Sequence, residues 1–244
     1  MENLICSNCN LQNLDSAKFC KNCGKKLFVV ELENHKPYLI RFLVSFFVIT
    51  FYILALNFIP VSSNDYIVSI SIDIIFFIIV SILTIVFFKY SKGIFSFKTF
   101  KFKKLLFYSS IQIGITLLCF SGIYILKKSF DIEKNNYIVN YLTSPNPLLF
   151  ATISIAIFPA ITEEIAFRGI LFGQLTKLIS NNSSIFVTGF IFALVHFNFL
   201  SFFWLIPAGI FYGWMREREG IIWYGTILHF LHNFSVIFIE YISL

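Results

Sequence analysis

Polar side chains that can move protons interrupt one long apolar run in the second half of the chain. They are Glu163, Glu164 and Arg168. Glu164 and Arg168 are four residues apart, which is the spacing of an ion pair on a helix. Glu163 then points about 100° away from Glu164 and has no partner on its own helix. An unpaired carboxylate that faces a wet cavity is a candidate general base.

Two further apolar runs carry histidines. His196 lies in one of them, and His229 and Asn233 stand four apart in the last, on one helix face. An α-helix rises about 1.5 Å per residue. This rise places three side chains at similar depths in a membrane: Glu163, His196 and His229. A carboxylate beside an imidazole can deprotonate water, and an imidazole with an amide donor can stabilise an oxyanion. Two histidines and a carboxylate can also hold a catalytic zinc ion, so the residues leave glutamate and metal catalysis both open.

Paired cysteines near the N-terminus predict a metal site of another kind. Cys6 and Cys9 form one C-x-x-C pair, and Cys20 and Cys23 form a second after ten intervening residues. Four thiolates make a closed tetrahedral zinc site, which is structural because it has no open position. Gly24 can adopt the left-handed backbone that such a turn needs, and Asn10 is the next most tolerant residue type. A redox dithiol is disfavoured because no thioredoxin-like pattern surrounds the pairs.

The composition identifies the solvent in which most of the chain must fold. Of its residues, 57% are hydrophobic, 13% are charged and 33 are Phe, whereas ordinary globular chains are about a quarter charged. A soluble domain could not cover so much apolar surface, so we expect a multi-pass protein of the cell membrane with lipid as its partner. The net charge of +6 fits membrane orientation, and no nucleic-acid partner is expected.

The apolar runs predict an all-α fold: a polytopic transmembrane helix bundle of about seven spans, preceded by a small zinc ribbon. The ribbon takes residues 1–27, a charged linker residues 28–37, and the membrane domain residues 38–244. So small a ribbon would draw its folding energy from bound zinc. Helices are favoured over a barrel because the runs are apolar on both parities. The expected spans are Phe42–Ile59, Tyr66–Phe88, Leu105–Leu126, Pro147–Leu178, Ser184–Asn198, Leu200–Met215 and Ile221–Ile242.

Basic residues indicate the orientation of the spans. Most of the Lys and Arg residues in the short loops fall on one side if the N-terminus is inside. The exceptions are Lys127, Lys128 and Lys134, between the third and fourth spans. No apolar signal segment precedes the cysteines. We therefore expect a cytosolic ribbon, in a reducing compartment where paired cysteines favour metal over a disulfide.

Three motifs in the second half of the chain resemble, in order and spacing, those of the CPBP family, which includes CAAX proteases of the Rce type and bacteriocin-processing enzymes. They are Glu-Glu-x-x-x-Arg at 163–168, Phe-x-x-x-His at 192–196 and His-x-x-x-Asn at 229–233. The matching region covers residues 147–243, as a protease-like core, and the ribbon lies outside it. The resemblance implies an intramembrane endopeptidase that acts on a peptide or a lipidated protein.

The resemblance also implies a role for each motif residue. Glu163 would activate water with help from His196. His229 and Asn233 would stabilise the oxyanion. Arg168 would hold Glu164 in place.

Two other classes of function fit parts of the sequence. A non-catalytic immunity or scaffold protein could keep the same bundle, although the intact motifs favour the protease. A small transporter would give a role to Asp73, which interrupts the second span, but no paired broken helices with matching halves are evident. A buried hydrogen-bonded carboxylate also explains Asp73. His232, between His229 and Asn233, has no assigned role.

Overall fold

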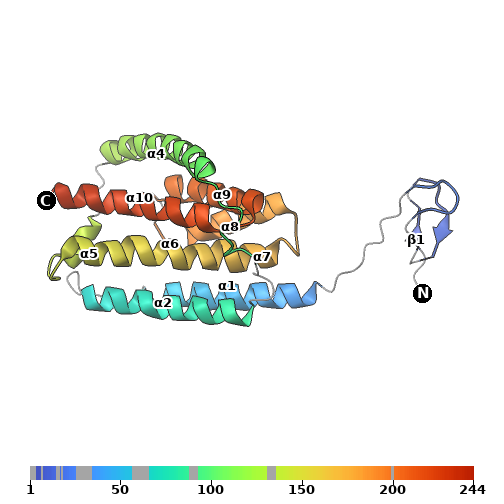
Figure 1. Ribbon diagram of the computed structural model, residues 1–244, viewed down its shortest axis with the longest axis horizontal. Coiled ribbons are helices and arrows are strands. Elements are labelled where there is room, and N and C mark those ends of the chain that lie inside the picture. Colours follow the sequence, from blue (N-terminus) through green and yellow to red (C-terminus); the bar gives the residue numbers. More distant parts are fainter. Residues whose placement is uncertain are drawn as a thin grey trace. The chain divides into compact units, whose positions relative to one another are not determined.

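The computed structural model divides the chain into two compact units, residues Met1–Pro37 and Tyr38–Leu244. Figure 1 shows both units. The structure describes residues 4–6, 8–14, 17, 19–25, 35–56, 66–87, 93–130, 136–198 and 201–244.

The N-terminal unit is built around two short strands. β1 (Leu4–Ile5) pairs with β2 (Gln12–Asn13) in an antiparallel ladder. Asn10 and Gly24 both have positive φ angles, of 54° and 68°. Each follows a C-x-x-C pair, and its backbone N–H donates to the carbonyl of the first cysteine of that pair. The two turns predicted from the sequence are therefore present, one at the end of each C-x-x-C pair.

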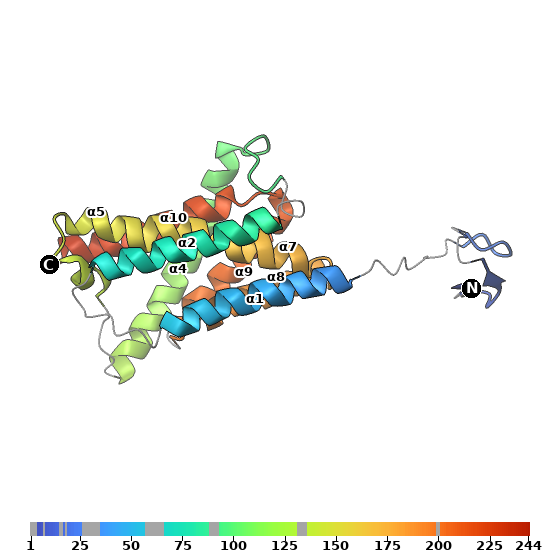
Figure 2. The same cartoon turned by 90° about the horizontal axis from the view of Figure 1, so that it is seen from below.

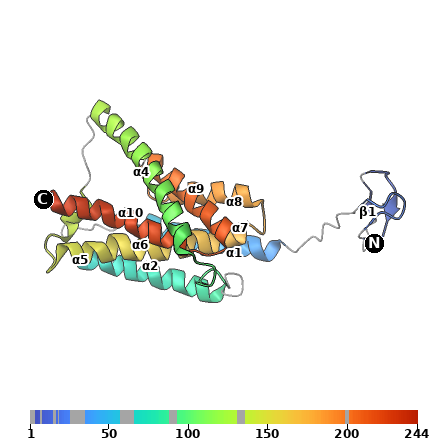
Figure 3. The same ribbon diagram turned by 45° about the horizontal axis from the view of Figure 1, so that its top comes forward.

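The second unit is a bundle of long helices. Its main helices are α1 (Lys36–Leu56), α2 (Tyr66–Val86), α4 (Phe102–Phe130), α8 (Asn181–Leu194), α9 (Phe202–Glu219) and α10 (Trp223–Ile242), together with a composite helix over Pro147–Leu175. A short 3₁₀ helix, η1 (Tyr137–Tyr141), precedes the composite helix. The composite helix lies between α1 and α2 on one side and α9 and α10 on the other (Figures 1 and 2). Helix α4 runs obliquely across α9 and α10 (Figure 3).

The composite helix changes its hydrogen-bonding register twice. Its parts are α5 (Pro147–Ala151), η2 (Thr152–Ile157), α6 (Phe158–Glu163), η3 (Glu164–Leu171) and α7 (Phe172–Leu175), of which η2 and η3 are π-helical. The helix begins after Asn146, whose side chain accepts a hydrogen bond from the backbone N–H of Leu149. Pro159 is the second residue after η2, and proline has no N–H for the carbonyl four residues earlier. The break at η2 therefore has a cause in the sequence.

The outer surface of the bundle is apolar. Phe51, Ile85 and Leu118 are each more than 70% exposed, which is expected of side chains that face lipid. Among the described residues, four helices are long and apolar enough to cross a membrane: α1, α2, the composite helix and α10, with α8 a shorter apolar helix. Each of the seven apolar runs recognised in the sequence is centred on one main helix. The predicted all-α membrane bundle with an N-terminal ribbon is confirmed.

Helix boundaries differ from the expected spans by a few residues, and at the fifth and sixth runs the difference changes the position of polar residues. Helix α8 ends at Leu194, so His196 lies in the turn after the helix instead of inside a span that reaches Asn198. Helix α9 continues to Glu219, so Arg216 and Arg218 occupy its last turn instead of a loop. Cations in the last turn of a helix are favoured by its dipole, which hydropathy does not register.

Candidate active site

A buried ion pair forms the base of the site. Nη1 of Arg168 lies 3.0 Å from Oε1 of Glu164, and both side chains are 1% exposed. The contact is a charge pair without hydrogen-bond alignment, because Nη1 makes no hydrogen bond. The guanidinium also donates from Nη2 to the carbonyl of Gly209 and lies 4.3 Å from the centre of the Phe192 ring. Arg168 and Glu164 thus compensate each other where lipid and protein exclude water.

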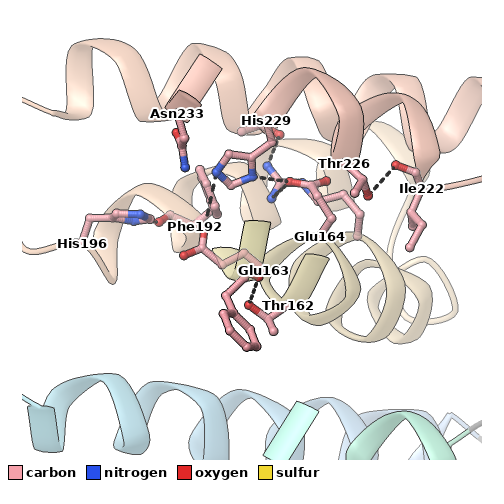
Figure 4. Close-up of polar contacts among 12 residues, drawn as sticks. Thr162, Glu163, Glu164, Phe192, His196, Ile222, Thr226, His229 and Asn233 are labelled. Carbon is pink, nitrogen blue, oxygen red and sulfur yellow. Dashed lines mark hydrogen bonds and ion pairs between the residues drawn. The ribbon is translucent and has the colours of Figure 1, made fainter. Parts of the chain in front are cut away.

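Helix α10 packs directly against this ion pair and contacts the carboxylate of Glu164. A Cβ atom at Gly225 would lie 2.7 Å from Oε2 of Glu164, so the glycine leaves room for the carboxylate in its present position. One turn further on, Nδ1 of His229 lies 3.3 Å from Oε1 of Glu164. A carboxylate accepts hydrogen bonds, so Nδ1 carries the proton of this contact. Nε2 of His229 then faces Oε2 of Glu163 at 3.9 Å (Figure 4).

Glu163 faces a pocket of about 170 Å³ between α1, α2, η3 and the turn after α8. The polar side chains that line the pocket are Tyr52, Asp73, Glu163 and His196. Oε2 of Glu163 is buried and has no hydrogen-bond partner in the part of the chain that the structure describes. The carboxylate that was expected to lack a partner on its own helix therefore keeps one oxygen available to a water molecule.

His196 reaches the same pocket from the turn after α8. Its Nδ1 lies 2.7 Å from the carbonyl oxygen of Phe192. Because a carbonyl can only accept, Nδ1 is the donor, and this hydrogen bond fixes the tautomer. In the neutral ring the lone pair then resides on Nε2. Figure 4 shows the imidazole directed toward the Glu163 carboxylate.

Asn233 stands one helical turn beyond His229 on α10. Its amide nitrogen donates to the carbonyl oxygen of Ile155 over 2.9 Å. Ile155 is four residues before Pro159, so in an α-helix its carbonyl would face the proline nitrogen, which has no hydrogen to offer. Asn233 supplies the missing donor, and its amide retains a second N–H. The structure thus brings Glu163, Glu164, Arg168, His196, His229 and Asn233 into one region of the bundle.

Two polar residues had no role in the site predicted from the sequence. Asp73 accepts a hydrogen bond from the hydroxyl of Ser154 and lines the pocket with Glu163 and His196. The signal for it was present, since a carboxylate inside an apolar span marks a functional residue by default. His232 stacks on Trp204 with ring centres 4.0 Å apart, which is a packing contact between α10 and α9.

The four cysteines of the N-terminal unit converge on one point. Their sulfur atoms all lie within 4.8 Å of one another. Cys20 also accepts from Nδ2 of Asn13, and the backbone N–H of Cys23 is the main reason that the pKa of the Cys20 thiol falls to about 6. A lowered thiol pKa favours the thiolate that binds zinc. A hydrogen bond to the backbone of Leu11 lowers the pKa of the neighbouring Cys9 thiol, but burial and the Cys20 sulfur outweigh it and raise that pKa to about 11. A donor set of four sulfurs in this arrangement fits a structural zinc ion.

Purified full-length protein is expected to contain one zinc ion per chain. Replacing Cys20 or Cys23 with Ser should remove it, because a closed four-sulfur site loses a ligand that nothing else supplies. Elemental analysis of the protein and its variants measures this. Cys119→Ser is the matched control, since this fifth cysteine lies in α4, and should keep the zinc. A wild-type protein without zinc under reducing conditions would contradict the assignment.

Comparison with known proteins adds two matches. Residues 145–235 match the family described as type II CAAX prenyl endopeptidase Rce1-like. Residues 5–27 match a zinc-ribbon domain. Searches of curated proteins and of solved structures found no significant match. The first match covers the composite helix, α8, α9 and the part of α10 that carries His229 and Asn233.

Proposed function

We propose that this chain, which joins a zinc-ribbon domain to an Rce1-like CAAX endopeptidase domain, is an intramembrane endopeptidase. Glu163 is the general base of the reaction. The observation that carries this proposal is Oε2 of Glu163, which is buried, makes no hydrogen bond within the described part of the chain, and lies in a pocket that Glu163 shares with His196. The substrate is a peptide segment of a membrane-anchored or lipidated protein.

Water activation would take place in this pocket. A water molecule that donates one hydrogen to Oε2 of Glu163 and the other to Nε2 of His196 has its lone pairs directed away from both. As the oxygen attacks the peptide carbonyl, Glu163 accepts the proton. The same carboxyl group then returns the proton to the departing amine, so that the base is regenerated in each turnover.

Negative charge that develops on the carbonyl oxygen needs donors that are already in place. We assign this role to the His229 ring in its imidazolium form, which donates from both nitrogens, and to the second amide N–H of Asn233, both on α10. Glu164 engages Nδ1 of His229, and Ile155 engages the other N–H of Asn233. Both donors are therefore oriented before substrate arrives, which is the property that makes such groups effective.

We propose that the reaction uses the carboxylate directly. Among the described residues, the four cysteines are the one group of at least three Cys, His, Asp or Glu side chains whose donor atoms converge as metal ligands. The polar residues of the membrane site are instead hydrogen-bonded to separate partners. His196 contacts the carbonyl of Phe192, His229 contacts Glu164, and Asn233 donates to the carbonyl of Ile155. This distribution favours the glutamate mechanism over the metal mechanism that the sequence left open.

The proposed function is tested with purified full-length protein in liposomes. A reporter peptide tethered to the membrane by a single helix or a lipid is added, and the products are identified by mass spectrometry. Cleavage at a defined peptide bond is expected. A complete absence of cleavage over a panel of lipidated and helix-anchored reporters would favour the non-catalytic scaffold.

The orientation of the bundle is a separate proposal: the ribbon is cytosolic and the C-terminus is external. Single cysteines at Asn136 and Ser243 should then react with an impermeant thiol reagent added to intact cells, whereas one at Asn182 should not. All three positions are exposed at ends of helices, and the background lacks the native cysteines. Reaction at Asn182 alone would reverse the orientation.

A further inference from the structure

Asp73 is a carboxylate in the middle of α2, the most apolar of the helices that can span the membrane. A carboxylate at such a position is costly unless it has partners or a function. Its partner is Ser154, whose hydroxyl donates to Oδ2. Helix α2 packs against η2, α6 and η3, so this hydrogen bond joins α2 to the composite helix at its first π-helical segment.

Ser154 and the next residue of η2 are held from opposite sides. Asp73 engages the side chain of Ser154, and Asn233 engages the carbonyl of Ile155. The carbonyl of Ile155 is available because Pro159 cannot donate to it. The break in the composite helix is therefore anchored to α2 through one residue and to α10 through its neighbour, and any shift of η2 moves the acceptor that orients Asn233.

We propose that Asp73 is a positioning residue for peptide hydrolysis, acting through Ser154 and the Ile155 carbonyl to orient the amide of Asn233. The proposal rests on the proposed function, in which that amide stabilises the oxyanion. Asp73 fixes η2 by accepting from Ser154, and η2 fixes one N–H of Asn233 so that the other points at the reacting carbonyl. The property of Asp73 that matters is its hydrogen-bond acceptor.

Substitutions at Asp73 and Ser154 separate this role from a role of charge. Asp73→Ala and Ser154→Ala should each lower kcat by between about tenfold and about a hundredfold, because small displacements of an oriented group are costly. KM should stay unchanged. Asp73→Asn keeps an oxygen that can accept from Ser154 and should retain most of the wild-type kcat. Ser71→Ala is the matched control, since Ser71 is an exposed serine of α2 whose hydroxyl donates to the carbonyl of Ile67 in its own helix.

A double-mutant cycle with Asn233 tests whether the effect passes through that residue. Asn233→Ala should lower kcat, and adding Ser154→Ala to it should lower kcat by no more than about twofold further, because members of one unit are not additive. Multiplicative losses, or a loss in Asp73→Asn as large as in Asp73→Ala, would overturn the proposal. Thermal unfolding of each variant accompanies the kinetics. If the wild type does not cleave, or Glu163→Gln cleaves as well as the wild type, the proposed function fails instead.

Discussion

Glu163→Gln is expected to abolish peptide hydrolysis while the protein keeps its fold. Glutamine has nearly the shape of glutamate, so the pocket and the packing of η3 should persist. It cannot accept a proton from water, so the step in which the nucleophile forms is lost. Turnover of the membrane-tethered reporter should fall below detection, and the temperature of thermal unfolding should change by no more than a few degrees.

The matched control for this prediction is Glu217→Gln on α9. Glu217 is an exposed carboxylate that accepts a hydrogen bond from Asn181, away from the pocket. The Glu217→Gln variant should cleave the reporter at the wild-type rate. His196→Ala alone should also lower turnover strongly, since both groups act on one water molecule. Full activity in Glu163→Gln would leave the glutamate mechanism without its base.

Arg168→Ala is expected to lower stability and activity together. It leaves Glu164 as a fully buried carboxylate without its guanidinium partner, and breaking a buried pair in this way costs about 3–5 kcal/mol of the free energy of unfolding. It also removes the packing of the guanidinium on the Phe192 ring. Without a fixed Glu164, His229 loses the partner that orients its ring, so turnover should fall as well.

A double substitution distinguishes the two consequences of losing Arg168. Arg168→Met combined with Glu164→Leu replaces the pair with apolar groups of similar volume and should recover much of the lost stability. Turnover should stay low, because the double variant has no carboxylate beside Nδ1 of His229. Arg218→Ala is the control, since Arg218 is largely exposed. Equal unfolding temperatures for Arg168→Ala and the wild type would show that the pair does not stabilise the bundle.

Several features of the fold were predictable because they follow from local chemistry. The apolar runs located the main helices, and the C-x-x-C pairs located the two turns at Asn10 and Gly24. The spacing of Glu164 and Arg168 predicted their ion pair, which the structure contains. In each case the partners are near in sequence, so helix or turn geometry alone determines the contact.

The contacts between helices were not predictable in the same way. His229 contacts both Glu163 and Glu164, where the sequence suggested an oxyanion donor or a metal ligand in the last span. Asp73 reaches Ser154 across 81 residues. Such pairs depend on how the helices are rotated about their axes, and a helix that is apolar all round carries little information about rotation. The π-helical segments were missed because hydropathy does not distinguish a π-helix from an α-helix.

The two π-helical segments also bear on how the chain tolerates changes in length. A turn closed by i→i+5 hydrogen bonds holds one residue more than an α-turn, and one residue corresponds to about 100° around the axis. Deleting one residue from η2 would let that turn become α-helical. The side chains of Glu163 and Glu164 would keep their directions around the helix axis. The same deletion within α6 (Phe158–Glu163) would rotate both carboxylates relative to Ser154 and Ile155. Relatives that differ in length along this helix should therefore carry their gaps in η2 or η3.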